Sequence, residues 1–160
     1  MKNKTSVLFV CTGNRFRSLT ADYSLKKLAK DKLIVGSAGT RAKKEKIHPA
    51  IIDELLKHDI DVRKHHQRKL NKKILFSYDL VVAMSVPHKK FMKEKFGYDA
   101  VLFNKICYGK ETPILDLQEQ IPDYKIKKKE SDKYLRKTVN YIIKSMPRFM
   151  KNYEKYVLNI

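Results

Sequence analysis

Disulfides and membrane-spanning segments are what this sequence most plainly lacks. Its 160 residues contain two cysteines, Cys11 and Cys107. Two cysteines are too few for a disulfide framework, so each is either a buried apolar residue or a reactive thiol. No apolar run approaches the roughly 20 residues that cross a bilayer, and the run from Val7 to Cys11 is too short for a signal peptide. We therefore expect a soluble cytoplasmic protein, with a single domain over residues 1–160.

Acidic residues are also scarce. The chain has 17 of them against 36 lysines and arginines, which gives a net charge of +19. Such a field attracts anions of any kind, including phosphate and nucleic acid. The lysines are spread over every segment and no basic motif is interleaved with aromatic residues, which argues against a nucleic-acid partner.

Apolar, β-branched segments alternate with segments of helical periodicity along most of the chain. The pattern predicts strands at residues 6–10, 32–40, 78–84 and 100–103, and helices at 17–30, 48–60 and 86–97. This alternation predicts an α/β fold of three layers, in which a four-stranded parallel sheet carries helices on both faces. Functional sites in such sheets lie at the carboxyl ends of the strands.

The last third of the sequence has a different pattern. Residues 104–129 predict a long irregular segment, of a length that is often functional. A closing helix is predicted from about residue 131 to 157, because apolar side chains recur there at spacings of three and four. Pro147 is expected to kink or split that helix.

The stretch "CTGNRFRS", from Cys11 to Ser18, carries the clearest chemical signal. It joins the first predicted strand to the first predicted helix, where backbone N–H groups and the helix dipole favour an anion. Arg17 can hold two oxygens of a phosphoryl group at once. The predicted phosphate-binding residues are Thr12, Gly13, Asn14, Arg15, Phe16, Arg17 and Ser18.

Cys11 would lie directly beneath a phosphate bound in this loop. The same N–H groups and arginine stabilise its thiolate relative to the thiol. A thiolate in that place can attack phosphorus in line and form a phosphocysteine, and Ser18 can donate a hydrogen bond to the sulfur when it leaves. The alternative interpretation is that Cys11 is simply the buried last residue of a strand.

The Cys-x5-Arg-Ser pattern at this turn resembles the low-molecular-weight protein tyrosine phosphatase family. The likeness extends to "VLFVCTGNRFRSLTADY", "GSAGT", "HDIDVRKHHQRKL" and "YDLVVAMSVPHKKFMKEKF", and "IPDYK" stands where the family has its general-acid loop. The resemblance implies hydrolysis of a phosphomonoester, either a phosphorylated protein or a small aryl phosphate, without a metal or another cofactor.

The resemblance also implies roles for individual residues. Cys11 attacks, Arg17 and the loop amides stabilise the equatorial oxygens, and an aspartic acid protonates the leaving oxygen. Asp123 is the candidate acid, and Asp116 is its rival.

A supporting network is implied as well. In it, Asn14 is hydrogen-bonded to Ser37 and His65, so that a strained loop is held in its anion-binding form. His66 is a possible substitute for His65.

The sequence departs from the family after the third predicted strand, where Ser85 replaces a common aspartate, and at three places in or near the loop and the acid. Phe16 stands where many members have a second cysteine, so reversible protection of Cys11 by a loop neighbour is not expected. Arg15 replaces an apolar residue or threonine, and a cation there disfavours phosphoarginine if it faces the pocket. Tyr124 and Lys125 replace the proline and paired aromatics that usually follow the acid.

Two other functions are open at this point. Arsenate reductases of the same fold pass oxidation along two further cysteines, whereas this chain offers only Cys107. A phosphate- or nucleic-acid-binding protein without turnover would retain the loop and use the high positive charge.

Overall fold

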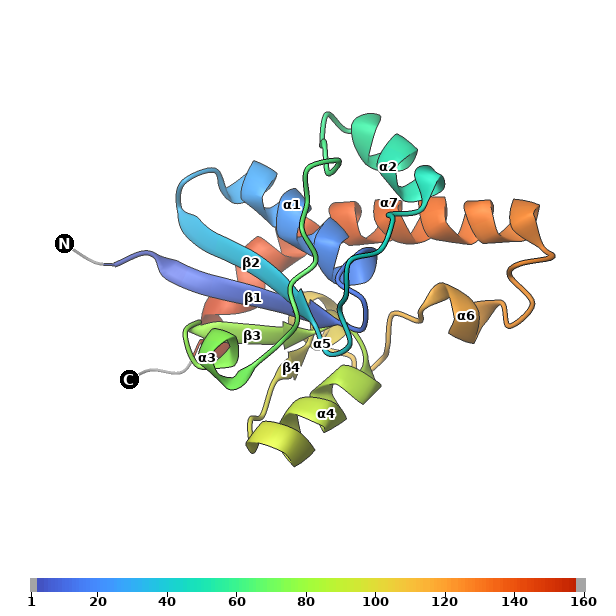
Figure 1. Cartoon of the computed structure of the whole chain (residues 1–160). Coiled ribbons are helices and arrows are strands. Elements are labelled where there is room, and N and C mark those ends of the chain that lie inside the picture. The colour runs from blue at the N-terminus through green and yellow to red at the C-terminus, as the bar shows by residue number, and fades with distance from the viewer. Residues whose placement is uncertain (1–2, 158–160) are drawn as a thin grey trace.

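A four-stranded parallel sheet organises the chain. The computed structural model describes residues 3–157, and Figure 1 shows their arrangement. The strands are β1 (Thr5–Cys11), β2 (Leu33–Gly39), β3 (Leu80–Ala83) and β4 (Val101–Leu102), in the order β2-β1-β3-β4. β1 pairs with β2 along its whole length and with β3 on its other side, all in parallel. The predicted fold class is confirmed.

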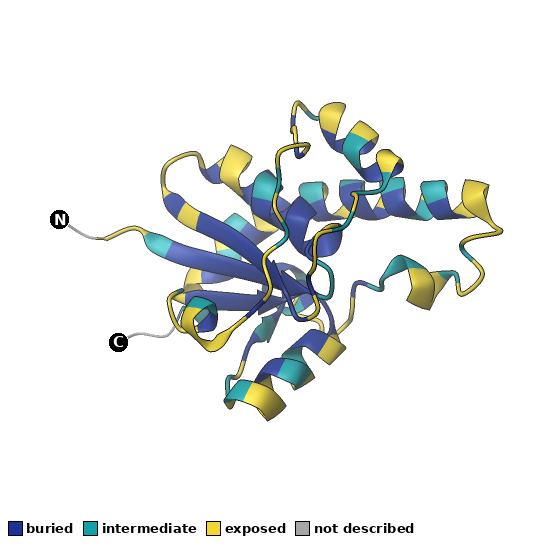
Figure 2. Ribbon diagram, viewed as in Figure 1, coloured by how far each residue is buried: buried dark blue, intermediate teal, exposed yellow. Residues whose placement is uncertain are grey.

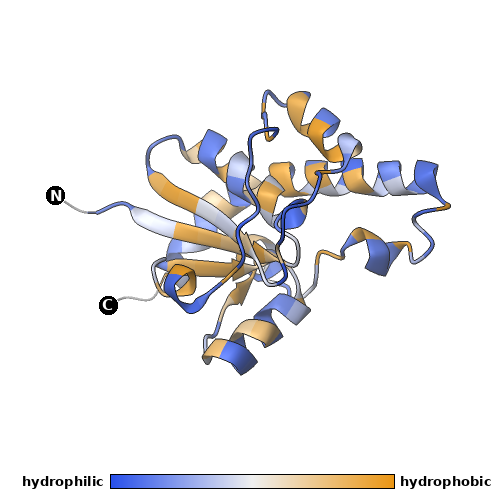
Figure 3. Cartoon of the chain, in the orientation of Figure 1, coloured by the Kyte–Doolittle hydropathy of each residue, from blue (hydrophilic) through white to orange (hydrophobic). Residues whose placement is uncertain are grey.

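Helices cover both faces of this sheet (Figure 1). On one face lie α1 (Arg17–Ala29), α5 (Phe103–Tyr108) and α7 (Lys128–Asn152), and on the other lie α3 (Lys72–Leu75) and α4 (Val86–Phe96). Because successive side chains of a strand point to opposite faces, Val7 and Phe9 enter the first core whereas Leu8 and Val10 enter the second. Figures 2 and 3 show the result, with buried and hydrophobic residues concentrated in the strands and on the inner sides of the helices.

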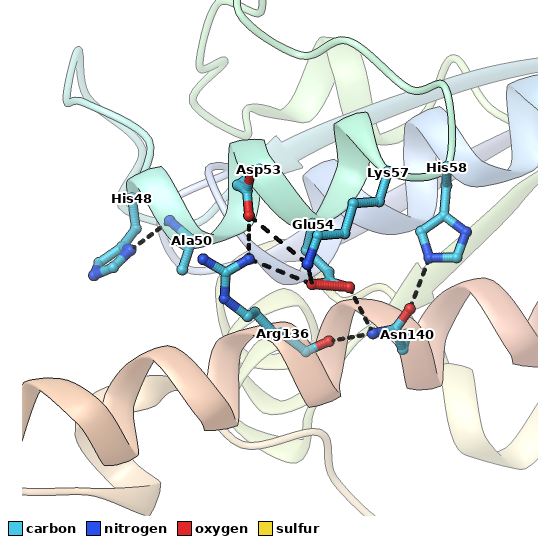
Figure 4. A network of polar contacts seen from close by, with 8 residues as sticks. All are labelled: His48, Ala50, Asp53, Glu54, Lys57, His58, Arg136 and Asn140. Atoms are coloured by element: carbon cyan, nitrogen blue, oxygen red, sulfur yellow. Dashed lines mark hydrogen bonds and ion pairs between the residues drawn. The ribbon is translucent and has the colours of Figure 1, made fainter.

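α2 (Pro49–Leu56) packs outside this arrangement, against α1 and α7. A network of hydrogen bonds and ion pairs connects α2 to α7, as Figure 4 shows. The Glu54 carboxylate, which is largely buried, accepts hydrogen bonds from Asn140 at 3.0 Å and Lys57 at 3.3 Å. Arg136 contacts both Asp53 and Glu54. Each charge in the network therefore meets an opposite charge or an amide, as groups placed between helices require.

The structure corrects the predictions for the last third of the chain. Residues 104–129 are not wholly irregular, because they contain most of α5 as well as α6 (Leu117–Gln120). Phe103 and Ile106 hold α5 in the core, and Asp116 and Glu119 form a capping box at the start of α6.

The closing helix begins and ends earlier than predicted, and Pro147 does not divide it. α7 begins at Lys128 and continues through Pro147 to Asn152, where the short helix η1 (Tyr153–Tyr156) follows. Met146 and Phe149, on either side of the proline, are both buried in the core, and their packing offsets the one hydrogen bond that Pro147 removes. None of the helices that the structure describes combines the length and the apolar character needed to cross a membrane.

Candidate active site

The predicted phosphate loop lies at the carboxyl end of β1. Cys11 is the last residue of that strand and pairs with Gly39 of β2, and Thr40 donates its backbone N–H to the Cys11 carbonyl at 2.9 Å. A Cβ on Gly39 would lie 2.4 Å from the Thr12 carbonyl oxygen and 2.9 Å from the Asn14 nitrogen. Both are backbone atoms, so only glycine lets β2 run this close to the loop.

The sulfur of Cys11 has one polar neighbour in particular, the hydroxyl of Ser18, at 2.8 Å. The direction of this hydrogen bond follows from Asn14. Its Oδ1 accepts the backbone N–H of Arg68 at 3.0 Å, so its amide nitrogen is the group that donates to Ser18 Oγ at 3.0 Å. The Ser18 oxygen is thus already an acceptor, which leaves its own O–H to donate to the sulfur, as the sequence predicted.

Asn14 is held in a left-handed backbone conformation, with φ of 55°. Such a conformation is costly for a residue with a Cβ, and contacts from outside the loop support it. The His65 Nε2–H donates to the Asn14 carbonyl at 3.0 Å, while His65 Nδ1 accepts from the Tyr23 hydroxyl at 3.2 Å. Burial lowers the pKa of His65, which favours this neutral form.

The supporting network therefore differs in one member from the predicted one. His65 contacts Asn14, whereas its neighbour His66 is exposed. Ser37 does not contact Asn14; its hydroxyl donates to the buried carboxylate of Asp22 at 2.6 Å. The serine bonded to Asn14 is Ser18, within the loop itself.

Arg17 is almost completely buried, with 2% of its surface exposed, and it lies at the first turn of α1. One guanidinium nitrogen donates to the Ile114 carbonyl at 2.9 Å. The other lies 3.4 Å from the Thr12 hydroxyl and 3.3 Å from a carboxylate oxygen of Asp116. These contacts fix the plane of the guanidinium, so its donors are arranged before any substrate arrives.

His88, on α4, is a site residue that the sequence analysis missed. Its Nε2 is 2.9 Å from the Thr12 hydroxyl, and its side chain is 2% exposed. Burial, with a smaller contribution from Arg17, lowers the pKa of His88 to about 3, so the imidazole is neutral. A usable signal was present, since His88 follows the carboxyl end of β3 by only five residues.

A pocket of about 380 Å³ opens above Cys11. Thr12, Gly13 and Arg17 line it from the loop. Two further segments form its walls, with Arg41, Lys43 and Glu45 in one and Asp116, Leu117, Gln118 and Tyr124 in the other. Phe16, Leu117 and Tyr124 supply apolar and aromatic surface.

The two candidate acids are placed differently. Asp116 lines the pocket and pairs with Arg17 at 3.3 Å. Asp123 pairs with Lys127 at 3.6 Å, on a half-exposed part of the segment before α7. The structure thus brings the rival, Asp116, to the loop.

Arg15 reaches across the edge of the loop to the opposite wall. A Cβ on Gly13 would lie 3.4 Å from Arg15 Cγ, which shows that the arginine stem covers this glycine. The Arg15 guanidinium pairs with Glu45 at 2.6 Å and donates to the Lys46 carbonyl at 3.3 Å. Arg15 therefore connects the loop to the wall formed by residues 41–45.

The second cysteine lies in the core. Cys107 is 2% exposed, and its thiol is 3.7 Å from the Ser145 carbonyl. Burial raises the pKa of Cys107 to about 12. A thiol that stays protonated in this way is a poor nucleophile.

Known proteins resemble this chain in sequence and in structure. A family model described as low molecular weight phosphotyrosine protein phosphatase matches residues 6–157. Arsenate reductase 2 of Staphylococcus haemolyticus is 34% identical over 105 residues, which are 61% of this chain and 79% of that protein.

Among solved structures, a YwlE mutant from Bacillus subtilis has a TM-score of 0.78 and 26% identity, over 92% of this chain and 97% of its own. A YwlE arginine phosphatase in which serine replaces cysteine, and whose active-site serine is phosphorylated, has a TM-score of 0.77 and 25% identity, over 92% and 94% of the two chains.

Proposed function

Because the chain belongs to the low molecular weight phosphotyrosine protein phosphatase family, a family of cysteine-dependent phosphatases, we propose that it hydrolyses phosphomonoesters through a phosphocysteine on Cys11. The observation that carries the proposal is the pocket, whose lining includes both Cys11 and the buried Arg17 at the other end of the loop. The phosphorylated active-site serine of the structural neighbour described above supports a covalent phosphoenzyme.

In the first step, the Cys11 thiolate attacks phosphorus, a sulfur–phosphorus bond forms, and the bond from phosphorus to the leaving oxygen breaks. The Arg17 guanidinium and the N–H groups at the start of α1 stabilise the charge on the equatorial oxygens. In the second step, water attacks the phosphocysteine and the sulfur leaves as thiolate. The hydrogen bond from Ser18, at 2.8 Å, stabilises that thiolate.

The leaving oxygen needs a proton in the first step, and the geometry favours Asp116 as its source. Asp116 lines the pocket and gives up its pair with Arg17 when a phosphoryl group takes the guanidinium, whereas Asp123 is not among the pocket-lining residues and is paired with Lys127. The same carboxylate, once deprotonated, can activate the water of the second step.

A matched pair of variants tests this assignment. We expect Asp116→Asn to lower kcat by about 10²-fold or more on phenyl phosphate, and less on a nitrophenyl ester, whose leaving group needs less help from an acid. Asp123→Asn should stay within about threefold of the parent on both esters. The opposite ranking would assign the acid to Asp123.

Cys11→Ser tests the nucleophile. We expect it to abolish turnover of an aryl phosphate, and we expect a chelator to leave the parent enzyme unaffected. Rapid acid quench of the parent should trap a phosphorylated protein. Undiminished turnover by Cys11→Ser would refute the proposed function.

We further propose phosphotyrosine in a protein as the substrate class. Phe16, Leu117 and Tyr124 offer a phenyl ring apolar and aromatic contacts. Arg41 and Lys43, which line the same pocket, disfavour a positively charged guanidinium, whereas Arg15 is paired with Glu45. Phosphotyrosine, phosphoarginine and phosphoserine peptides should be compared on one preparation. A higher kcat/KM for phosphoarginine would overturn this choice.

Arsenate reduction is the second candidate, because arsenate reductase 2 of Staphylococcus haemolyticus is among the relatives of this chain. The position of Cys107 argues against it. That thiol is buried with a pKa of about 12, and the chain contains no third cysteine. Reduction of arsenate at the expense of a dithiol, at a rate comparable to ester hydrolysis, would reverse this preference.

A further inference from the structure

Arg15 is the residue of the loop that phosphate chemistry leaves unexplained. Its stem lies over Gly13 and its guanidinium is turned away from the loop, toward Glu45 at 2.6 Å. Arg17 already supplies a buried arginine for a bound phosphoryl group. What Arg15 holds in place is the wall formed by residues 41–45.

That wall presents alternate residues to the pocket. Arg41, Lys43 and Glu45 line it, while Ala42 between them is buried. Both Arg41 and Lys43 are exposed to solvent, so a molecule in the pocket can reach them. We call Arg41, Lys43 and Glu45, together with Arg15, the cationic wall.

The cationic wall carries more positive charge than it neutralises. Within residues 3–157, Glu45 is its one carboxylate, and it is shared between Arg15 at 2.6 Å and Lys43 at 3.3 Å. Three cations against one anion leave an excess of two positive charges beside the phosphate site. A neutral residue beside the phosphorylated one would form no ion pair with these excess charges.

We propose, on the basis of the proposed function, that the cationic wall binds a carboxylate of the substrate, so that the enzyme selects phosphorylated peptides with acidic residues beside the phosphorylated one. Arg41 and Lys43 contact the carboxylate, and the Arg15–Glu45 pair positions the wall. Exposed ion pairs are individually weak, each changing affinity about 1.4- to 5-fold, so the pair of cations yields selectivity of about fivefold.

The test compares two phosphotyrosine peptides that differ only in flanking residues, Asp and Glu in one and Asn and Gln in the other. We expect kcat/KM to be about fivefold higher for the acidic peptide at low ionic strength, and the ratio to approach one near 1 M salt. A ratio near one at low salt would overturn the proposal.

Variants assign the effect to the wall. Arg41→Gln combined with Lys43→Gln should bring the ratio of acidic to neutral peptide to within about 1.5-fold of unity. Lys90→Gln combined with Lys144→Gln is the matched control, because it removes two charges from exposed positions on α4 and α7. If the control lowers the ratio as much, overall charge is responsible and the proposal is wrong.

Glu45→Gln gives a change of opposite sign. The amide that replaces the carboxylate and the Lys46 carbonyl can still accept from Arg15, which keeps the wall in position. The negative charge shared by Arg15 and Lys43 is lost, so the preference for the acidic peptide should rise about twofold. A fall in the preference would contradict the role given to Glu45.

A binding measurement separates this inference from the proposed function. The Cys11→Ser protein should bind the acidic peptide more tightly than the neutral one by the same factor, measured by fluorescence anisotropy. If the Cys11→Ser protein prefers the acidic peptide but the parent hydrolyses no ester, the proposed phosphatase function is refuted and the proposed role of the cationic wall stands. If the parent hydrolyses aryl phosphate but the two peptides bind equally, the role of the cationic wall is refuted and the phosphatase function stands.

Discussion

The buried imidazole of His88 makes stability depend on pH in a calculable way. Its pKa is about 3 in the folded protein, against an ordinary value of about 6.5 in the unfolded chain. Between these values the unfolded chain binds a proton that the folded protein does not. The contribution of neutral His88 is therefore fully present above pH 6.5 and is lost as the pH falls from 6.5 toward 3.

The size of the effect follows from the two pKa values. Between pH 7 and pH 5, His88 lowers the free energy of unfolding by about 2 kcal/mol. In His88→Gln the side chain does not titrate, while its amide can still bond to the Thr12 hydroxyl. We expect the loss of stability between pH 7 and pH 5 to be about 2 kcal/mol smaller in this variant than in the parent.

Urea unfolding followed by far-ultraviolet circular dichroism at the two pH values measures this difference. His66→Gln is the control, because His66 is exposed and next to His65 in sequence. It should retain the pH dependence of the parent. If His88→Gln and the parent lose the same stability between pH 7 and pH 5, His88 is not a neutral group with a pKa lowered by burial, and the reasoning is wrong.

Two further predictions concern the shape of the loop. Gly39→Ala would place a Cβ 2.4 Å from a backbone oxygen of the loop, so we expect a loss of about 1–3 kcal/mol in stability and more than tenfold in kcat/KM. Gly97→Ala, in open space at φ of 65°, should lower stability by about 1 kcal/mol and leave kcat/KM unchanged; an equal loss of activity in both variants would contradict the argument. Asn14→Ala leaves the Arg68 N–H and the Ser18 hydroxyl without their partner, so thermal unfolding should show a loss of about 2–3 kcal/mol, together with a lower kcat for aryl phosphates. Wild-type kcat in a destabilised Asn14→Ala protein would show that the network does not shape the loop.

The parts of the fold that could be predicted are those with a strong local pattern. The apolar run of β1 and the Cys-x5-Arg-Ser loop were readable because strand, turn and helix start follow one another within 18 residues. α5 and α6 were missed because helices of six and four residues have no periodicity to read. Tertiary contacts of Phe103 and the capping of Asp116 stabilise them instead.

In the site, too, the residues fixed by a local pattern could be predicted, and those placed by distant contacts could not. Cys11, Arg17 and Ser18 are fixed relative to one another by the local turn. The position of Asp116 against Asp123 depends on where a long segment crosses the pocket, and no local pattern encodes that path. Likewise, Asn14 bonds to Ser18 and not to Ser37, because Ser37 is drawn to the carboxylate of Asp22 from α1.

The contacts that support Asn14 also determine when, during folding, the loop can take its final conformation. The groups that hold its left-handed backbone, His65 and Arg68, come 51 and 54 residues later in the sequence. During synthesis the loop leaves the ribosome before these residues do. Until they are made, the loop has no such support and Cys11 is an ordinary, solvated thiol. On the proposed mechanism, Cys11 becomes a nucleophile only when the later segment docks, so a partly made or misfolded chain would carry no active nucleophile. The rate at which Cys11 reacts with an alkylating reagent during refolding would therefore record the arrival of residues 65–68.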